Sequence, residues 1–209
     1  LELDADLIEA NGANVTKEPL NQEKLVNETL EEIKKASFFV SKIETKPQSS
    51  SPKAPFRTST LQMSAASSLG FTADRTMRSA QNLYEGGLIT YLRTDGISIS
   101  TSPNTGEPFS EEKPGPPPLQ EIRNLIKKEF DETFLSEEVR VYKSKVQNSQ
   151  EAHEAIRPTN ISNKPKDLNL SLDEQKLYEL IWNRTVASQM VNSKHERKSL
   201  TISSKDGKY

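Results

Sequence analysis

A tyrosine and an arginine two positions apart, Tyr91 and Arg93, are the residues of this chain best suited to chemistry. Tyrosine is a weak nucleophile at neutral pH because its unperturbed hydroxyl pKa is about 10. A nearby guanidinium stabilises a phenolate and also binds a phosphate through paired hydrogen bonds. Since side chains alternate along a strand, the β-prone run 88–92 predicts that both residues project to one side. This arrangement suits attack on a phosphodiester, although a hydrogen-bonded strand tyrosine beside a surface arginine is the commoner cause of such spacing.

A second polar cluster lies between Asn148 and Pro158 and contains one histidine, two glutamates and one arginine. His153 could donate a hydrogen bond to a phosphate oxygen or relay a proton near neutral pH. The same residues also fit a helix end, with Glu in its first turn and Pro158 as its stop. The periodicity of the segment does not decide between these two interpretations.

The composition of the 209 residues excludes several classes of protein. There is no cysteine, which excludes disulfides, thiolate metal sites and cysteine nucleophiles, and two histidines cannot form a histidine-rich metal site alone. No apolar run approaches the roughly 20 residues that cross a bilayer. The chain begins with Leu1 and ends on the turn signal Asp206–Tyr209 without a following strand. We therefore expect a piece of a longer, cytoplasmic protein.

The net charge of -2 conceals two oppositely charged segments. Residues 1–32 carry nine acidic and two basic side chains, whereas residues 33–57 carry six basic and one acidic side chain. A local basic run of this kind suits a nucleic-acid surface, and it also fits an ordinary solvated face.

Hydrophobic patterning places short β segments at both ends of the chain and helices between them. Strands are predicted at 1–8, 38–44, 88–92 and 199–203, and helices at 21–36, 59–69, 72–86, 118–134 and 171–190. Residues 46–55 and 101–118 are rich in proline and serine, which predicts a linker and a loop. The helices at 59–69 and 72–86 are separated by a short turn at Gly70, the pattern of a helix-turn-helix or of a plain α-hairpin.

These elements predict an α+β fold, with a mainly helical, winged-helix-like domain inserted into a small β domain whose strands come from both ends of the chain. The predicted domains are 1–57, the first part of the β domain with its linker; 58–192, the helical domain; and 193–209, the return strand.

Five segments, in order, resemble the type IA DNA topoisomerases of bacteria. Ile89–Asp95 resembles the active-site tyrosine signature of that family, and Gln150–Pro158 resembles the signature that carries its active-site histidine. The matching flanking segments are Pro55–Gln62, Leu83–Gly87 and Tyr178–Trp182. Departures from the pattern are Leu92 in place of methionine, Gly96 in place of serine, and an apparent insertion at 101–118.

The resemblance implies a role for each matching residue. Tyr91 would be the nucleophile that becomes joined to a 5′ phosphate, Arg93 would hold the scissile phosphate, and His153 would contact the phosphate. The residues implied to bind DNA or to orient these groups are Thr90, Asp95, Arg57, Arg157 and Glu151. The resemblance also implies that the helical domain carries the tyrosine and that the β domain forms part of a gated ring.

The resemblance further implies partners and a cofactor. The substrate would be single-stranded or negatively supercoiled DNA, and relaxation of its supercoils would need no ATP. The protein would act in the bacterial cytoplasm, at the nucleoid, with no membrane as a partner. Mg²⁺ would be bound by a Toprim domain on the remainder of the topoisomerase chain. Since no segment here resembles that domain, we expect no metal site in this chain and little activity from it alone. The alternatives are a non-catalytic helix-turn-helix DNA-binding module and a structural hinge.

Overall fold

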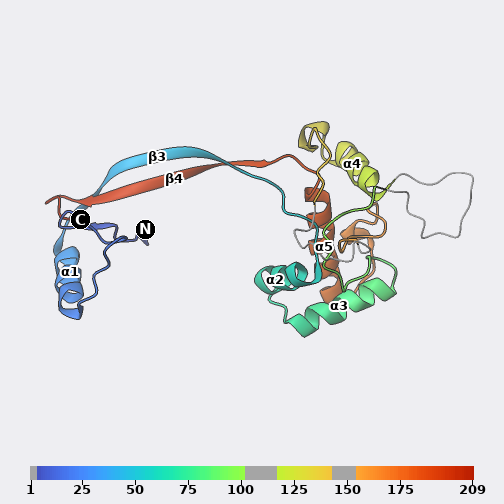
Figure 1. The fold of residues 1–209 in the computed structure, drawn as a ribbon, viewed down its shortest axis with the longest axis horizontal. Helices are drawn as coiled ribbons and strands as arrows, with labels where there is room; N and C mark the ends of the chain where they lie inside the picture. The colour runs from blue at the N-terminus through green and yellow to red at the C-terminus, as the bar shows by residue number, and fades with distance from the viewer. Residues whose placement is uncertain (1–3, 102–116, 143–153) are drawn as a thin grey trace, which may run out of the picture. The chain divides into compact units, whose positions relative to one another are not determined.

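The computed structural model describes residues 4–101, 117–142 and 154–209, and the chain divides into two compact units. Unit 1 comprises Leu1–Ser49 and Lys194–Tyr209, and unit 2 comprises Ser50–Ser193. Figure 1 labels the elements of each unit. No helix within the described ranges is long and apolar enough to cross a membrane.

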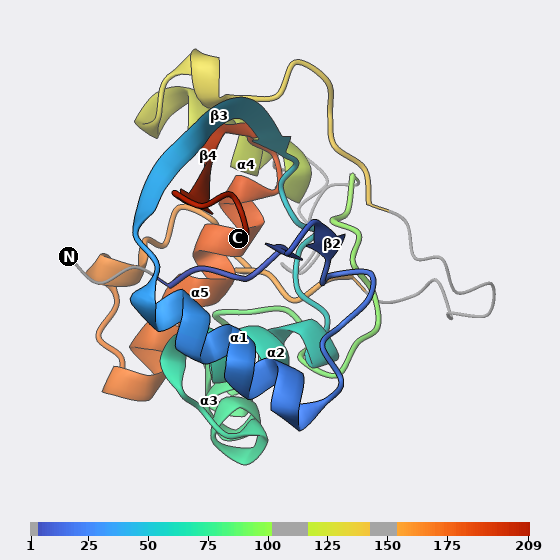
Figure 2. The same ribbon diagram turned by 90° about the vertical axis from the view of Figure 1, so that its left-hand side faces the viewer.

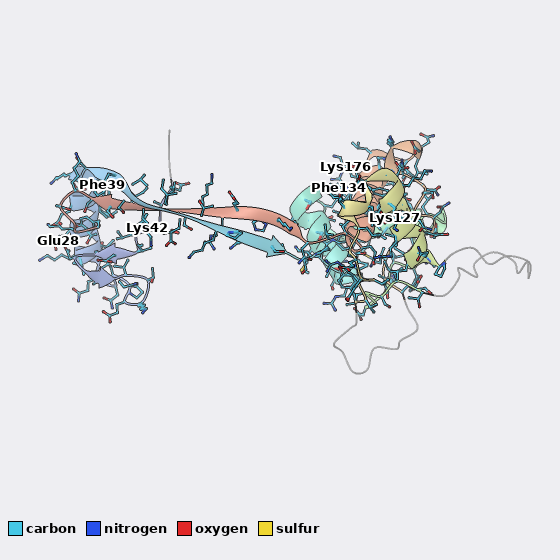
Figure 3. The ribbon with its side chains drawn as sticks, turned by 90° about the horizontal axis from the view of Figure 1, so that it is seen from above. Glu28, Phe39, Lys42, Lys127, Phe134 and Lys176 are labelled. Carbon is cyan, nitrogen blue, oxygen red and sulfur yellow. The ribbon has the colours of Figure 1, made fainter. Side chains whose placement is uncertain are left out.

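Unit 1 is built on a long ribbon of two paired strands, β3 (Phe38–Ser50) and β4 (Ser193–Ser204), which run side by side in Figure 1. Side-chain bonds join Ser41 to Ser203 at 2.7 Å and Gln48 to His195 at 3.1 Å, an order that makes the strands antiparallel. The pairing confirms that the β part takes its strands from both ends of the chain. Phe39 and Lys42 are among the many ribbon side chains that project into solvent (Figure 3).

The other elements of unit 1 are short. They are β1 (Glu9–Ala10), β2 (Ala13–Asn14) and helix α1 (Glu23–Lys35). Asn11 and Gly12 join β1 to β2 with φ of 51° and 80°, the positive values that a tight two-residue hairpin turn requires. Glu32 on α1 accepts hydrogen bonds from Lys208 Nζ at 3.1 Å and Tyr209 Oη at 2.7 Å, which ties the last residues of the chain to α1.

Two predictions for unit 1 were wrong. Residues 4–8 form no strand, and pairing begins only at Glu9. The predicted linker at 46–55 is wrong for residues 46–50, because β3 continues to Ser50 and includes Pro47, although the boundary between the two units does fall inside the predicted segment, at Ser49 and Ser50. A two-stranded ribbon tolerates proline, since the outer edge of each strand has no hydrogen-bonding neighbour to lose.

Unit 2 packs helices around one hydrophobic core. Its elements are α2 (Thr58–Leu69), α3 (Ala73–Glu85), α4 (Pro118–Glu129), η1 (Glu132–Phe134), η2 (Pro165–Asp167) and α5 (Leu172–Ala187). Figures 1 and 2 show α2 and α3 together at one end of the unit and α4 at the other, and α5 packs against all three. Fully buried side chains of the core include Phe56, Leu61, Leu83, Leu92, Ile126, Ile156 and Ile181.

Local signals account for the ends of these helices. Gly70 ends α2 in the left-handed conformation, with φ of 67°. Thr72 caps α3 by accepting the Arg75 N–H at 3.2 Å, and the Ser171 N–H donates to Glu174 at 3.1 Å at the start of α5. Pro118 is the first residue of α4, where its missing N–H costs nothing.

Three predictions for unit 2 differ from the structure. Helix α4 ends at Glu129 rather than at Phe134, because Asp131 adopts a positive φ of 87° that no α-helix accommodates. Helix α5 ends at Ala187 rather than at 190. Residues 88–92 form no strand. Between its helices, the described part of unit 2 has isolated β-bridges in place of a sheet, so the predicted winged-helix likeness finds no support. Most of the predicted 101–118 loop lies outside the described residues.

Candidate active site

The candidate site begins where α3 ends. The Gly87 N–H donates to Tyr84 O and the Leu88 N–H donates to Leu83 O, both at 2.9 Å, so the helix closes and the chain turns back. Gly87 has a φ of 69°, which suits glycine. Ile89 then enters the core, and Tyr91 follows two residues later.

The residues after this turn alternate between solvent and core although they form no strand. Tyr91, Arg93 and Asp95 are exposed, whereas Leu92 and Thr94 are buried. The side chain of Tyr91 is 42% exposed. Strand alternation was expected to place Tyr91 and Arg93 on one side; the predicted strand was wrong, and both residues are exposed.

Residues 154–158, the described part of the second polar cluster, lie alongside the tyrosine segment and are held there by Thr90. The Thr90 hydroxyl donates to Ala155 O at 2.7 Å and accepts the Arg157 N–H at 3.0 Å. The Thr90 N–H donates to Arg157 O at 2.9 Å. Residues more than sixty positions apart in sequence are thus joined next to Tyr91, and the hydroxyl of Thr90 is satisfied within the protein.

A third segment, residues 56–58, also binds the tyrosine segment. The Thr58 hydroxyl donates to Leu92 O at 2.7 Å and accepts the Thr94 N–H at 2.9 Å. Phe56 O accepts the Ile156 N–H at 2.7 Å, so the same stretch also binds the described end of the second polar cluster. Residues 56–58, 88–96 and 154–159 therefore form one hydrogen-bonded framework.

Inside this framework lies an ion pair that the sequence analysis did not single out. The Arg157 guanidinium is 3% exposed and donates to Glu154 Oε2 at 2.7 Å and to Pro158 O at 2.9 Å. Glu154 Oε1 accepts the Ser100 N–H, and Glu154 O accepts the Thr94 hydroxyl at 3.1 Å. Burial and pairing place Arg157 where it braces the framework rather than where it would contact a phosphate.

Of the remaining predicted site residues, three lie in the described part of the chain and two do not. Arg57 is half-buried at the start of α2, and Arg93 and Asp95 are exposed. Arg75 and Arg157 are paired with carboxylates, but in the part of the chain that the structure describes Arg57 and Arg93 have no ion-pair partner. His153 and Glu151 lie outside the described residues.

The described ranges contain no group of three or more His, Asp or Glu side chains that could hold a metal ion. The described framework carries two carboxylates, and they do not form a magnesium site by themselves, since Asp95 is exposed and Glu154 is bonded to Arg157. The chemistry that this part of the chain offers is therefore an exposed phenol with one exposed arginine, Arg93, two residues away in sequence.

An exposed tyrosine two residues from an exposed arginine, on a segment that is hydrogen-bonded to two others, fits the class of enzymes that attack a phosphodiester with tyrosine. The comparison with known families agrees: the model of the family described as DNA topoisomerase matches residues 2–209, and this chain belongs to that family. The resemblance stated from the motifs is thereby confirmed.

Named relatives support the same assignment. DNA topoisomerase 1 of Rickettsia bellii is 43% identical over 98% of this chain, and that of Helicobacter pylori is 39% identical over 99% of it. Full-length topoisomerase I from Thermotoga maritima has a similar structure, with 37% identity and a TM-score of 0.61 over 87% of this chain. The chain spans 25%, 27% and 28% of the lengths of these three proteins.

Proposed function

We propose that this chain is the tyrosine-bearing region of a type IA DNA topoisomerase and that Tyr91 cuts one DNA strand. The observation that carries the proposal is the framework around the exposed tyrosine. Its hydrogen bonds join the tyrosine segment to two segments, 56–58 and 154–158, that resemble the same family. Rigid support of this kind is what a nucleophile needs for in-line attack.

The proposed step is a transesterification. The Tyr91 oxygen attacks the phosphorus, a phosphotyrosyl bond forms, and the bond from phosphorus to the 3′ oxygen breaks. The tyrosine hydroxyl loses its proton, and the departing 3′ oxygen gains one and becomes a free hydroxyl. One phosphodiester is exchanged for another, so rejoining requires no ATP.

Arg93 is proposed to bind the phosphate oxygens as charge develops on them, and Arg57 and Asp95 to contact the DNA strand. Thr90 and Arg157 are proposed to position Tyr91 through the framework, a role that their hydrogen bonds support. His153 and Glu151 keep the roles implied by the family resemblance, as a phosphate contact and an orienting residue.

The rest of the activity is proposed for the longer protein. A Toprim domain elsewhere in it would bind Mg²⁺, which would supply charge stabilisation at the phosphate. In this scheme residues 1–57 and 193–209 belong to the β part of a gated ring, and residues 58–192 form the tyrosine domain. Strand passage through the gap would then relax negatively supercoiled DNA in the cytoplasm.

A non-catalytic helix-turn-helix module is supported less well. Arg75, on the second helix of that pair, is bound to Asp173 by two hydrogen bonds of 2.7 and 2.6 Å. Three lysines of the basic run, Lys34, Lys42 and Lys46, form ion pairs with glutamates. Local carboxylates therefore offset part of this positive charge, with Lys42 and Lys46 sharing Glu44.

The polarity of the covalent bond tests the proposed reaction. The complete protein with Mg²⁺ is incubated with a single-stranded oligonucleotide labelled at one end and then denatured. Attachment to a 5′ phosphate predicts that a label at the 3′ end of the DNA remains on the protein, whereas a label at the 5′ end is released. Retention of the 5′ label, or a protein that forms no adduct with either DNA, would overturn the proposal.

Substitution of Arg93 by lysine is predicted to slow DNA cleavage by about tenfold or more, with a much smaller change in DNA affinity. Lysine keeps the positive charge but loses the planar pair of N–H donors that orients a phosphate. Single-turnover cleavage of labelled DNA measures the rate. Arg197→Lys, at an exposed arginine on β4, is the matched control, and equal rates for the two variants would contradict the role of Arg93.

A further inference from the structure

Tyr91 is accompanied by a second tyrosine that the proposed reaction does not use. The rings of Tyr84 and Tyr91 meet edge to face, with their centroids 5.5 Å apart and their planes at 68°. This is the arrangement that the charge distribution of aromatic rings favours. The contact joins the last turn of α3 to the proposed nucleophile.

Tyr84 stands on a fixed support. Its carbonyl accepts the Gly87 N–H at 2.9 Å, and the preceding residue, Leu83, is buried in the core. One residue further back, the Asn82 side chain donates to Glu174 of α5 at 2.8 Å, so the end of α3 is also bound to a neighbouring helix. The backbone position of Tyr84 is therefore well defined.

The ring of Tyr91 is held less firmly by the core. It is 42% exposed, and its two neighbours in sequence, Thr90 and Leu92, are the residues that bind the framework and the core. Bonds of this kind fix the backbone of the tyrosine segment, whereas the side-chain torsions of Tyr91 depend on contacts that the side chain itself makes. A fixed ring against one edge or face of Tyr91 restricts those torsions.

We propose that Tyr84 is a positioning residue for Tyr91: the ring of Tyr84 holds the phenol of Tyr91 in the orientation required for attack on the phosphate. The proposal rests on the proposed function of Tyr91. It assigns the role to the ring of Tyr84 and none to its hydroxyl. It also predicts an effect on the rate of cleavage rather than on DNA affinity, because a misoriented nucleophile binds no less DNA.

The test uses Tyr84→Ala and Tyr84→Phe in the complete protein. Aromatic contacts of this kind correspond to a factor of about two to ten, so Tyr84→Ala is expected to slow single-turnover cleavage by roughly fivefold. Its dissociation constant for single-stranded DNA is expected to match that of the unmodified protein, and Tyr84→Phe is expected to restore the cleavage rate.

Phe134→Ala is the matched control, since Phe134 is an exposed aromatic residue in the same unit, close to α4 (Figure 3). It should cleave at the normal rate. Thermal unfolding of each variant shows whether the loss of a ring has unfolded unit 2. If Tyr84→Ala destabilises the unit, Tyr84→Leu replaces it, because leucine keeps the bulk of the side chain without a ring. The cleavage rate of folded Tyr84→Leu then shows whether the ring is required.

Three results would overturn the proposal. One is an unchanged cleavage rate in folded Tyr84→Ala, and another is a slow Tyr84→Phe, which would assign the role to the hydroxyl. The third is a weakened DNA affinity that accounts for the whole effect, which would make Tyr84 a stacking surface for a base. Each of them leaves the function of Tyr91 intact, whereas an adduct formed by Tyr91→Phe would overturn the proposed function itself.

Discussion

Tyr91→Phe is expected to abolish the covalent complex with DNA while leaving DNA affinity nearly unchanged. The substitution removes the oxygen that forms the new bond to phosphorus, so the cleavage rate should fall by a factor on the order of 10⁴ or more. The phenylalanine ring keeps its size and its contact with Tyr84, and therefore the surrounding structure should persist. Labelled single-stranded DNA trapped on the denatured protein measures the adduct, and fluorescence anisotropy measures binding.

Tyr84→Phe is the matched control for this experiment, because it removes the hydroxyl of the adjacent tyrosine and leaves that of Tyr91. It should form the adduct at a nearly normal rate. A Tyr91→Phe protein that retains DNA after denaturation would show that another side chain is the nucleophile.

Glu154→Ala is expected to lower the free energy of unfolding of unit 2 by about 3 kcal/mol. The substitution leaves the buried Arg157 guanidinium without its carboxylate and deprives the Ser100 N–H of an acceptor. An uncompensated buried charge is costly because the protein interior solvates it poorly. Denaturant unfolding of the complete protein, followed by hydrogen exchange at residues of unit 2, measures the loss.

Glu129→Ala provides the comparison for Glu154→Ala. Glu129 pairs with Lys164 at 2.7 Å in the same unit, but the Lys164 side chain is 29% exposed, whereas that of Arg157 is 3% exposed. Water replaces much of what a surface pair contributes, so the loss should be far smaller. Equal losses for the two variants would show that the Glu154–Arg157 pair does not brace the framework.

The helices of unit 2 were predictable because their ends carry local signals. Thr72, Gly70, Pro118 and the pair Ser171–Glu174 act within one turn of the chain, and each was readable without knowledge of the fold. The overextension of α4 has an equally local cause. The apolar spacing continues to Phe134, but the positive φ at Asp131 interrupts the helix before that residue.

The strands were harder to predict because their partners lie far away in sequence. Residues 88–92 have the β-branched and aromatic composition of a strand. Their partners, however, are single positions such as Thr58 and the short segment 155–158, which form isolated bridges and side-chain bonds rather than a continuous ladder. The second half of β3 has the opposite character. Its serines, threonine and proline resemble a linker, but pairing with β4 makes them a strand.

Only those site residues were predictable whose side chains have suitable chemistry and also lie in a recognisable motif. Tyr91 and Arg93 could be named from the sequence, and both are exposed. The bracing roles of Thr58, Thr94 and Glu154 could not, since each depends on contacts across 34 or more positions. The spacing of Glu154 and Arg157, three residues apart, was the one local signal for their ion pair.

Identification of the tyrosine in the trapped complex tests the central claim most directly. Trypsin cleavage after Arg78 and Arg93 leaves Tyr84 and Tyr91 together in the peptide 79–93, so the nucleotide must be located within it. The adduct is trapped on unmodified protein, its DNA is digested to a short remnant, and the peptide is sequenced by fragmentation in a mass spectrometer. We predict that the added phosphate lies on Tyr91. A phosphate on Tyr84, or on a peptide outside 79–93, would contradict the assignment of Tyr91 as the nucleophile.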